Sequence, residues 1–167
     1  MQYSIVTVPR TGGHYLQERI SQHTNVEIPR HHEIQNNKMI TMARDPIDFL
    51  TSSVAMGYVN PTKENIVGLI NRYEYVYESV LDAYVAINYD DLTLYPYQTI
   101  KSLAKLLNFN VITESYESKL VDQPQYKHLV SSKKLKNYEI IKQDVSQQNL
   151  DKIYKIHNKM LSKCIAI

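Results

Sequence analysis

Residues 5–14 of the chain read Ile-Val-Thr-Val-Pro-Arg-Thr-Gly-Gly-His. The first four residues are all β-branched, which predicts a buried strand of a parallel sheet over 5–8. The glycines end the strand, and the spacing of Leu16 and Ile20 predicts a helix over 14–22. In such a turn the backbone N–H groups and the positive end of the helix converge on one point, which suits a phosphate. A tight turn that holds no ligand fits the same residues.

The remainder of the chain alternates short apolar runs with longer segments of helical spacing. Such alternation is typical of a parallel sheet with helices on both faces, in which ligands bind beyond the carboxyl ends of the strands. We therefore predict an α/β fold, with three layers (α/β/α) around a short parallel sheet, formed as a single domain over 1–167. Further strands are expected at 26–28, 38–43 and 84–88, and further helices at 46–56, 61–82, 97–107 and 146–163.

The composition excludes several classes of protein. The chain is 43% hydrophobic and 22% charged, has a formal net charge of +2, and contains no apolar run long enough to span a bilayer. So small a net charge gives no support for nucleic-acid binding. Cys164 is the single cysteine, which rules out an internal disulfide and a cysteine-rich metal site. We predict a cytoplasmic protein without a membrane span, and the sequence does not indicate its oligomeric state.

A second motif follows the strand expected at 38–43. It consists of Arg44, Asp45 and Pro46, with Ser52 eight residues after the arginine. Asp45 suits the cap of a helix and Pro46 suits its first turn. A guanidinium at the end of a strand can contact a phosphate through two parallel hydrogen bonds, and a serine two helical turns later can add another donor. A structural arginine and a capping or solvated serine are the alternative interpretation.

Three motifs occur in a fixed order along the chain. Residues 9–16 read Pro-Arg-Thr-Gly-Gly-His-Tyr-Leu, residues 44–46 read Arg-Asp-Pro with Ser52 beyond them, and residues 89–92 read Tyr-Asp-Asp-Leu before a helix that contains proline. In this order and spacing the chain resembles the cytosolic and bacterial sulfotransferases over residues 5–109. The resemblance implies a P-loop-like sulfotransferase fold that binds 3′-phosphoadenosine 5′-phosphosulfate (PAPS) and its desulfated product (PAP). It implies transfer of a sulfuryl group from PAPS to an acceptor hydroxyl or amine.

The resemblance also implies roles for individual residues. Arg10 matches the catalytic lysine or arginine of the family, and Arg44 with Ser52 matches its clamp on the 3′-phosphate. Tyr89 matches the tyrosine that lies near the adenine, and the lysines at 133–134 echo a late basic segment of the family without its glycines. The implied nucleotide-binding residues are Arg10, Thr11, Gly12, Gly13, His14, Tyr15, Arg44, Ser52, Tyr89, Lys133 and Lys134.

An acceptor hydroxyl must also lose a proton during the transfer. Histidine has a pKa suited to this work near neutral pH. We predict His32 as the general base, because similar proteins carry their base in the segment before the Arg-Asp-Pro strand. His31 and Glu33 are alternatives, and solvated loop histidines fit the same sequence. We predict no metal, since the histidines elsewhere in the chain show no ligand spacing.

Two departures from the family keep other functions open. Gly13 and His14 stand where the family has a pair of hydroxyl residues, and the chain is much shorter than typical members. A P-loop kinase acting on a nucleotide or a small molecule would share the sheet and the turn, but it needs a lysine near Gly13, which is absent. A non-catalytic nucleotide-binding protein on the same fold fits the two substitutions.

Overall fold

Four parallel strands form the sheet of the protein. The computed structural model describes residues 3–33, 38–55, 60, 62–80, 83–112, 141 and 145–167. Within these residues the strands pair in the order β2-β1-β3-β4. The strands are β1 (Tyr3–Val6), β2 (Arg30–His31), β3 (Lys38–Ala43) and β4 (Val85–Asn88). The predicted parallel sheet is confirmed.

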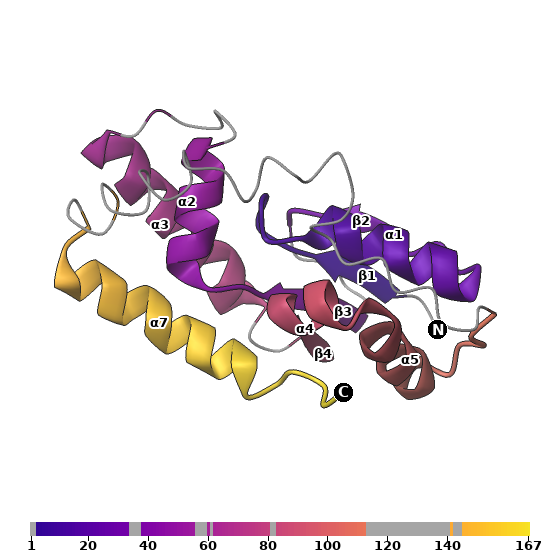
Figure 1. Ribbon diagram of the computed structural model, residues 1–167. Helices are drawn as coiled ribbons and strands as arrows, with labels where there is room; N and C mark the ends of the chain where they lie inside the picture. The colour runs from indigo at the N-terminus through magenta and orange to yellow at the C-terminus, as the bar shows by residue number, and fades with distance from the viewer. Residues whose placement is uncertain are drawn as a thin grey trace.

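Helices cover both faces of this sheet (Figure 1). The described helices are α1 (Gly13–Thr24), α2 (Pro46–Ala55), α3 (Lys63–Ser79), α4 (Tyr89–Leu94), α5 (Pro96–Leu107) and α7 (Gln147–Leu161). In Figure 1, α2, α3 and α7 lie to the left of the sheet, and α1 and α5 lie to its right. The apolar side chains of these two groups belong to two separate cores, one on each face. The arrangement is therefore the predicted three-layer α/β/α fold.

The alternation of side chains along the strands supplies both cores. The strand residues that pack against α1 and α5 are Ile5, Ile40, Met42, Val85 and Ile87. Those that pack against α2, α3 and α7 are Val6, Met39, Ala43 and Ala86. Because both faces are buried, β1, β3 and β4 consist mostly of apolar residues, as is typical of parallel sheets, whereas the edge strand β2 is polar.

Side-chain caps fix where four of the described helices begin, and in α4 the cap is Asn88, which accepts from the N–H of Asp90 at 3.0 Å. Asp45 Oδ1 accepts a 3.0 Å hydrogen bond from the backbone N–H of Asp48, which confirms Asp45 as the cap of α2. Thr62 and Ser146 cap α3 and α7 in the same way. A cap of this kind contributes about 1 kcal/mol. α2 therefore starts directly after β3, which leaves Arg44 at the carboxyl end of that strand.

The second strand lies at Arg30–His31, and its prediction at 26–28 was wrong. Ile28 is buried in the core beside α1 and α5, so the apolar residues of this segment contribute to packing without pairing. The first hydrogen bond between this segment and β1 is formed at Pro29, whose carbonyl accepts from the N–H of Ile5 at 2.9 Å. The polar residues that follow then pair with β1 through their backbone alone.

Smaller differences occur elsewhere. β1 covers residues 3–6, so Thr7 and Val8 belong to the loop after it, and the short α4 had not been predicted.

Past α7, a parallel bridge joins Cys164 to Ala86 of β4. The N–H of Ala86 donates to the Lys163 carbonyl at 3.3 Å, and the Ala86 carbonyl accepts from the N–H of Ile165 at 3.1 Å. Among the described helices none has the length and apolarity needed to cross a membrane.

Candidate functional site

The carboxyl ends of β1 and β3 mark the point where the winding of the chain reverses. From β1 the chain crosses through α1 to β2 on one side, and from β3 it crosses through α2 and α3 to β4 on the other side and the opposite face. In folds of this class, ligands bind at such a reversal, in the region outside the carboxyl ends of the two strands that is called the crevice below. The β1–α1 loop (residues 7–12) and the turn at Arg44 and Asp45 both lie here.

The two glycines at the end of the β1–α1 loop are required by their surroundings. Gly12 has a φ of 96°, in the left-handed region, and a Cβ there would lie 2.7 Å from Cδ2 of Tyr89. A Cβ on Gly13 would overlap the side chain of Thr7. The first turn of α1 has no acidic residue and no side-chain cap. The positive end of the helix is therefore available to an anion.

Arg10 holds an unusual backbone conformation within this loop. Its φ is 72°, a value that costs a residue with a side chain about 1–2 kcal/mol. The carbonyl oxygen of Arg10 accepts a 2.6 Å hydrogen bond from Nη1 of Arg44. Because bonds from a charged donor are among the strongest hydrogen bonds in proteins, Arg44 stabilises the loop in this conformation.

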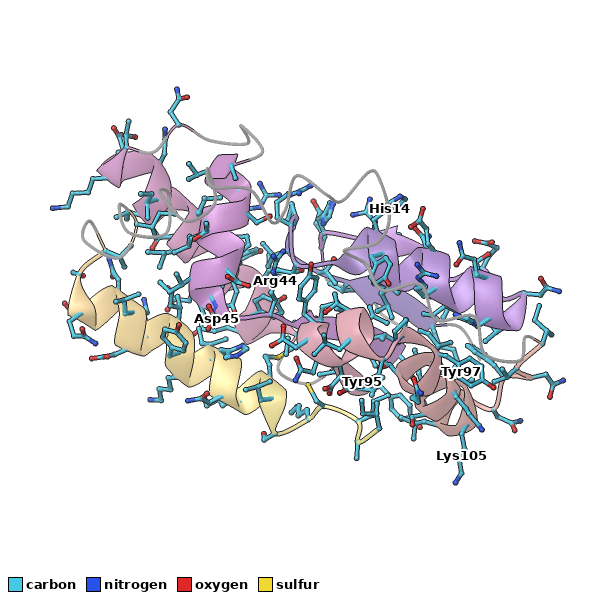
Figure 2. The ribbon with its side chains drawn as sticks, viewed as in Figure 1. His14, Arg44, Asp45, Tyr95, Tyr97 and Lys105 are labelled. Atoms are coloured by element: carbon cyan, nitrogen blue, oxygen red, sulfur yellow. The ribbon has the colours of Figure 1, made fainter. Side chains whose placement is uncertain are left out.

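The other predicted loop residues point in different directions. The hydroxyl of Thr11 is fully buried and donates to the Val8 carbonyl at 2.7 Å, within the loop itself. His14 is exposed, with its Nε2 3.6 Å from Oε1 of Glu18, and Figure 2 shows it at the start of α1, away from Arg44. Tyr15 is buried, and burial raises the pKa of its hydroxyl. The structure therefore offers backbone, and not these three side chains, at the start of α1.

Arg44 and Ser52 are buried donors on the segment that follows β3. Arg44 is 5% exposed and its Nε has no hydrogen-bond partner among the described residues. Ser52, on α2, is 1% exposed, and its hydroxyl likewise lacks a partner in the described part of the chain. Tyr73 of α3 steadies the turn by donating its hydroxyl to the Arg44 carbonyl at 3.3 Å. A buried polar group without a partner costs about 1–3 kcal/mol, so these donors are suited to a ligand.

Tyr89 lies between the loop and Arg44. The guanidinium carbon of Arg44 is 4.2 Å from the centre of the Tyr89 ring, a stacking contact, and the Cδ2 and Cε2 atoms of the ring lie against Gly12. Burial raises the pKa of the Tyr89 hydroxyl, although Arg44 and Arg10 act in the opposite direction. Tyr89 thus joins α4 to both motifs that the sequence had singled out.

Two residues of α7 reach the same turn and were missed by sequence reasoning. The hydroxyl of Tyr154 donates to Oδ2 of Asp45 at 2.9 Å, and the imidazole of His157 lies buried beside the Tyr154 ring. Burial lowers the pKa of His157, and the nearby carboxylates of Asp45 and Asp90 oppose this shift. Figure 2 shows Asp45 close to α7. No local pattern connects residues so distant in sequence.

His32 follows β2 in the sequence and lies beside Thr7, the first residue of the β1–α1 loop. Its Nδ1 is 2.8 Å from the carbonyl oxygen of Thr7, and its Nε2 is 3.3 Å from Nη1 of Arg30. His31 belongs to β2 and accepts the backbone N–H of Thr7 at 3.2 Å, while Glu33 is exposed. The structure therefore brings His32 to the same edge of the sheet as the loop and Arg44. Lys133 and Lys134 lie outside the described residues.

No group of three or more histidine, cysteine, aspartate or glutamate side chains is placed to hold a metal ion in the described part of the chain. Comparison with protein-family models, curated proteins and solved structures found no match to this chain. The functional interpretation therefore depends on the geometry of the site.

Proposed function

We propose that the protein is a sulfotransferase that uses PAPS as its donor and an acceptor hydroxyl or amine as its substrate. The proposal is supported by three sequence motifs that meet at one edge of the sheet. The loop with Arg10, the turn with Arg44, and Tyr89 are far apart in the chain and contact one another at the crevice. The resemblance to sulfotransferases rests on these same residues.

The observation that carries the proposal is the pair of buried donors after β3. The Nε of Arg44 and the hydroxyl of Ser52 are both buried, and neither has a partner in the described residues. On folding, these two donors lose their hydrogen bonds to water without gaining a described partner, which lowers the stability of the folded protein. A nucleotide 3′-phosphate bound there would satisfy both groups, and ADP lacks that phosphate.

The residues of the chain can then be given roles in the transfer. PAPS supplies the sulfuryl group, which passes directly to the acceptor. The positive end of α1 and the Arg10 side chain stabilise the negative charge that develops on the leaving phosphate oxygen. Arg44 and Tyr89 hold the nucleotide in place, which fixes donor and acceptor in line. His32 takes the proton of the acceptor hydroxyl.

The geometry gives less support to a kinase. A magnesium-dependent kinase of this fold would use an aspartate after β3, and Asp45 has that position. However, Oδ1 of Asp45 accepts from Asp48 N–H and Oδ2 accepts from Tyr154, so both oxygens are already engaged. The inward-pointing Thr11 hydroxyl favours a second candidate, a non-catalytic nucleotide-binding protein, because the loop then has fewer groups for the transferred sulfuryl oxygens.

Calorimetry with PAP, ADP and ATP, with and without magnesium, tests the proposal. PAP is expected to bind more tightly than ADP and without a need for magnesium. Arg44→Ala should weaken PAP binding about tenfold to a hundredfold, the range for a lost charge-assisted bond, while ADP affinity stays nearly constant. Arg72→Ala is the control, because Arg72 is exposed on α3 and its loss changes the net charge equally. Equal affinity for PAP and ADP in the unmodified protein rejects the PAPS assignment.

A further inference from the structure

The two contacts of His32 determine which of its ring nitrogens carries a proton. A carbonyl oxygen can only accept a hydrogen bond, so the Nδ1 that lies 2.8 Å from the Thr7 carbonyl must be the donor. A guanidinium can only donate, so the Nε2 that lies 3.3 Å from Arg30 must be the acceptor. His32 is therefore neutral in this arrangement, and the lone pair on Nε2, the one that can take up a proton, is occupied by Arg30.

Among the described residues no counter-charge lies beside Arg30. Its side chain is exposed, and no described carboxylate forms an ion pair with it. In the described part of the chain the imidazole contact engages only Nη1 of the guanidinium, which carries five N–H donors in all. A carboxylate, sulfate or phosphate can bind a guanidinium through two parallel hydrogen bonds and by charge attraction, which a single neutral imidazole nitrogen cannot offer. An anion at this edge of the sheet would therefore draw Arg30 away from the imidazole.

We propose that the acceptor substrate carries an anionic group, a carboxylate, sulfate or phosphate, which binds Arg30 and thereby releases Nε2 of His32 to act as the base. This inference rests on the proposed sulfuryl transfer and names the class of acceptor. Arg30 is then the residue that selects the acceptor, and a neutral hydroxyl compound leaves the base blocked.

The chemical step balances with these groups. The acceptor oxygen forms a bond to sulfur, and the bond between sulfur and the bridging oxygen of the phosphosulfate breaks, leaving its electron pair on the phosphate of PAP. The acceptor proton passes to Nε2, which makes His32 an imidazolium. An imidazolium beside the guanidinium of Arg30 would be repelled, and the anionic group of the acceptor offsets this repulsion. Anion binding thus favours the transfer both before and after the proton moves.

Nitrogen NMR of the histidine side chains tests the release of His32 without any nucleotide. His32→Gln identifies the resonance, and inorganic sulfate serves as the anion, with sodium chloride at equal ionic strength as the reference. In the unmodified protein, sulfate should shift the Nε2 resonance of His32 in a saturable way. In Arg30→Met the resonance should already have the shifted value and should not respond. Arg44→Ala should respond like the unmodified protein, because its lost contacts lie at the nucleotide site.

A paired acceptor assay follows from the same argument. With PAPS present, para-hydroxybenzoate should be sulfated about tenfold to a hundredfold faster than its neutral amide, the ratio expected for one bond to a charged group. Arg30→Met should bring this ratio close to one, and Arg72→Met should not. A His32 resonance that ignores sulfate, or that responds equally in Arg30→Met, overturns the inference. If the His32 resonance responds to sulfate but the protein does not bind PAP, the sulfotransferase proposal is rejected, while the anion site at Arg30 is retained.

Discussion

On the β3 side of the crevice Arg44 is held by three other segments, whereas on the β2 side Arg30 and His32 contact each other and one backbone carbonyl. Arg44 is buried, donates to the Arg10 carbonyl, stacks on Tyr89 and has its own carbonyl bonded by Tyr73. Arg30 is exposed. In the proposed transfer the donor is always PAPS, so its site can be rigid and preorganised, while the site for the acceptor must admit and release different molecules. We call the β3 side, with Arg44, the held side, and the β2 side, with Arg30 and His32, the open side. Substitutions on the two sides should affect different properties.

The largest effect should come from the loop on the held side. Gly12→Ala places a methyl group against Tyr89 in a residue whose φ is 96°. The left-handed backbone costs about 1–2 kcal/mol, and overpacking costs about 1–3 kcal/mol more. Urea unfolding should show this loss of stability. Gly68→Ala is the matched control: nothing lies near that site on α3, so alanine should stabilise the helix by about 1 kcal/mol. Equal effects of the two substitutions would contradict the packing of the loop.

The open side should respond in rate and not in binding. His32→Ala is expected to lower sulfuryl transfer about a hundredfold, the scale of a lost general base. PAP affinity measured by calorimetry should remain within about twofold of that of the unmodified protein, since no nucleotide contact is assigned to His32. Arg10→Ala should likewise lower the rate more than PAP binding, because in the proposed transfer its charge acts on the leaving oxygen. If the rate survives in His32→Ala but is lost when His31 or Glu33 is replaced, another residue of this segment is the base.

A smaller effect is expected where α7 reaches the held side. Tyr154→Phe removes the hydroxyl that bonds Asp45 at 2.9 Å, which should cost about 0.5–1.5 kcal/mol in the free energy of unfolding. PAP binding should weaken as well, because Asp45 adjoins Arg44. Lys152→Gln is the control, since it breaks the ion pair between α7 and Glu74 of α3 without touching Asp45. A loss of PAP affinity in the control equal to that in Tyr154→Phe would mean that general docking of α7 is responsible.

The pH dependence of stability should reveal the buried histidine of the same helix. Burial lowers the pKa of His157 in the folded protein, so below about pH 6.5 the unfolded chain binds more protons than the folded one. Stability should therefore fall as the pH is lowered from about 7.5 to about 5.5. His157→Gln should flatten this dependence, although His23, whose pKa burial also lowers, keeps part of it. Thermal melts across this range measure the slope.

The smallest effect is expected for the stability of the open side. Arg30→Met should change the free energy of unfolding by at most about 0.5 kcal/mol, the usual range for a surface position, because its contact with His32 is exposed. Urea unfolding at neutral pH measures it. A loss of more than about 2 kcal/mol would show that Arg30 holds the structure together, and the two sides of the crevice would then not differ as described.

The sequence predicted most of what local chemistry determines. β3 was predicted at its observed bounds, because an apolar run ends at a charged turn, and Asp45 and Pro46 marked the start of α2. β2 escaped prediction because its two residues pair by backbone bonds alone, which any side chain allows. α4 is too short for a periodic pattern.

The candidate site was predictable only in part for a similar reason. The two motifs at Arg10 and Arg44 have local signatures, and their approach follows from the order of the strands. The bond from Tyr154 to Asp45 joins residues 109 positions apart. No periodicity or cap in the sequence encodes such a distant contact, and only the packing of α7 reveals it.

The bridge between Cys164 and Ala86 bears on how the protein behaves at high concentration. Exposed sheet edges are templates on which copies of a protein can stack into aggregates. At the β4 edge, the carbonyl of Lys163 and the N–H of Ile165 already occupy the backbone groups of Ala86. At the opposite edge, β2 is only two residues long. As far as the structure describes them, both edges of the sheet therefore offer a second copy few free backbone groups, which disfavours edge-to-edge aggregation.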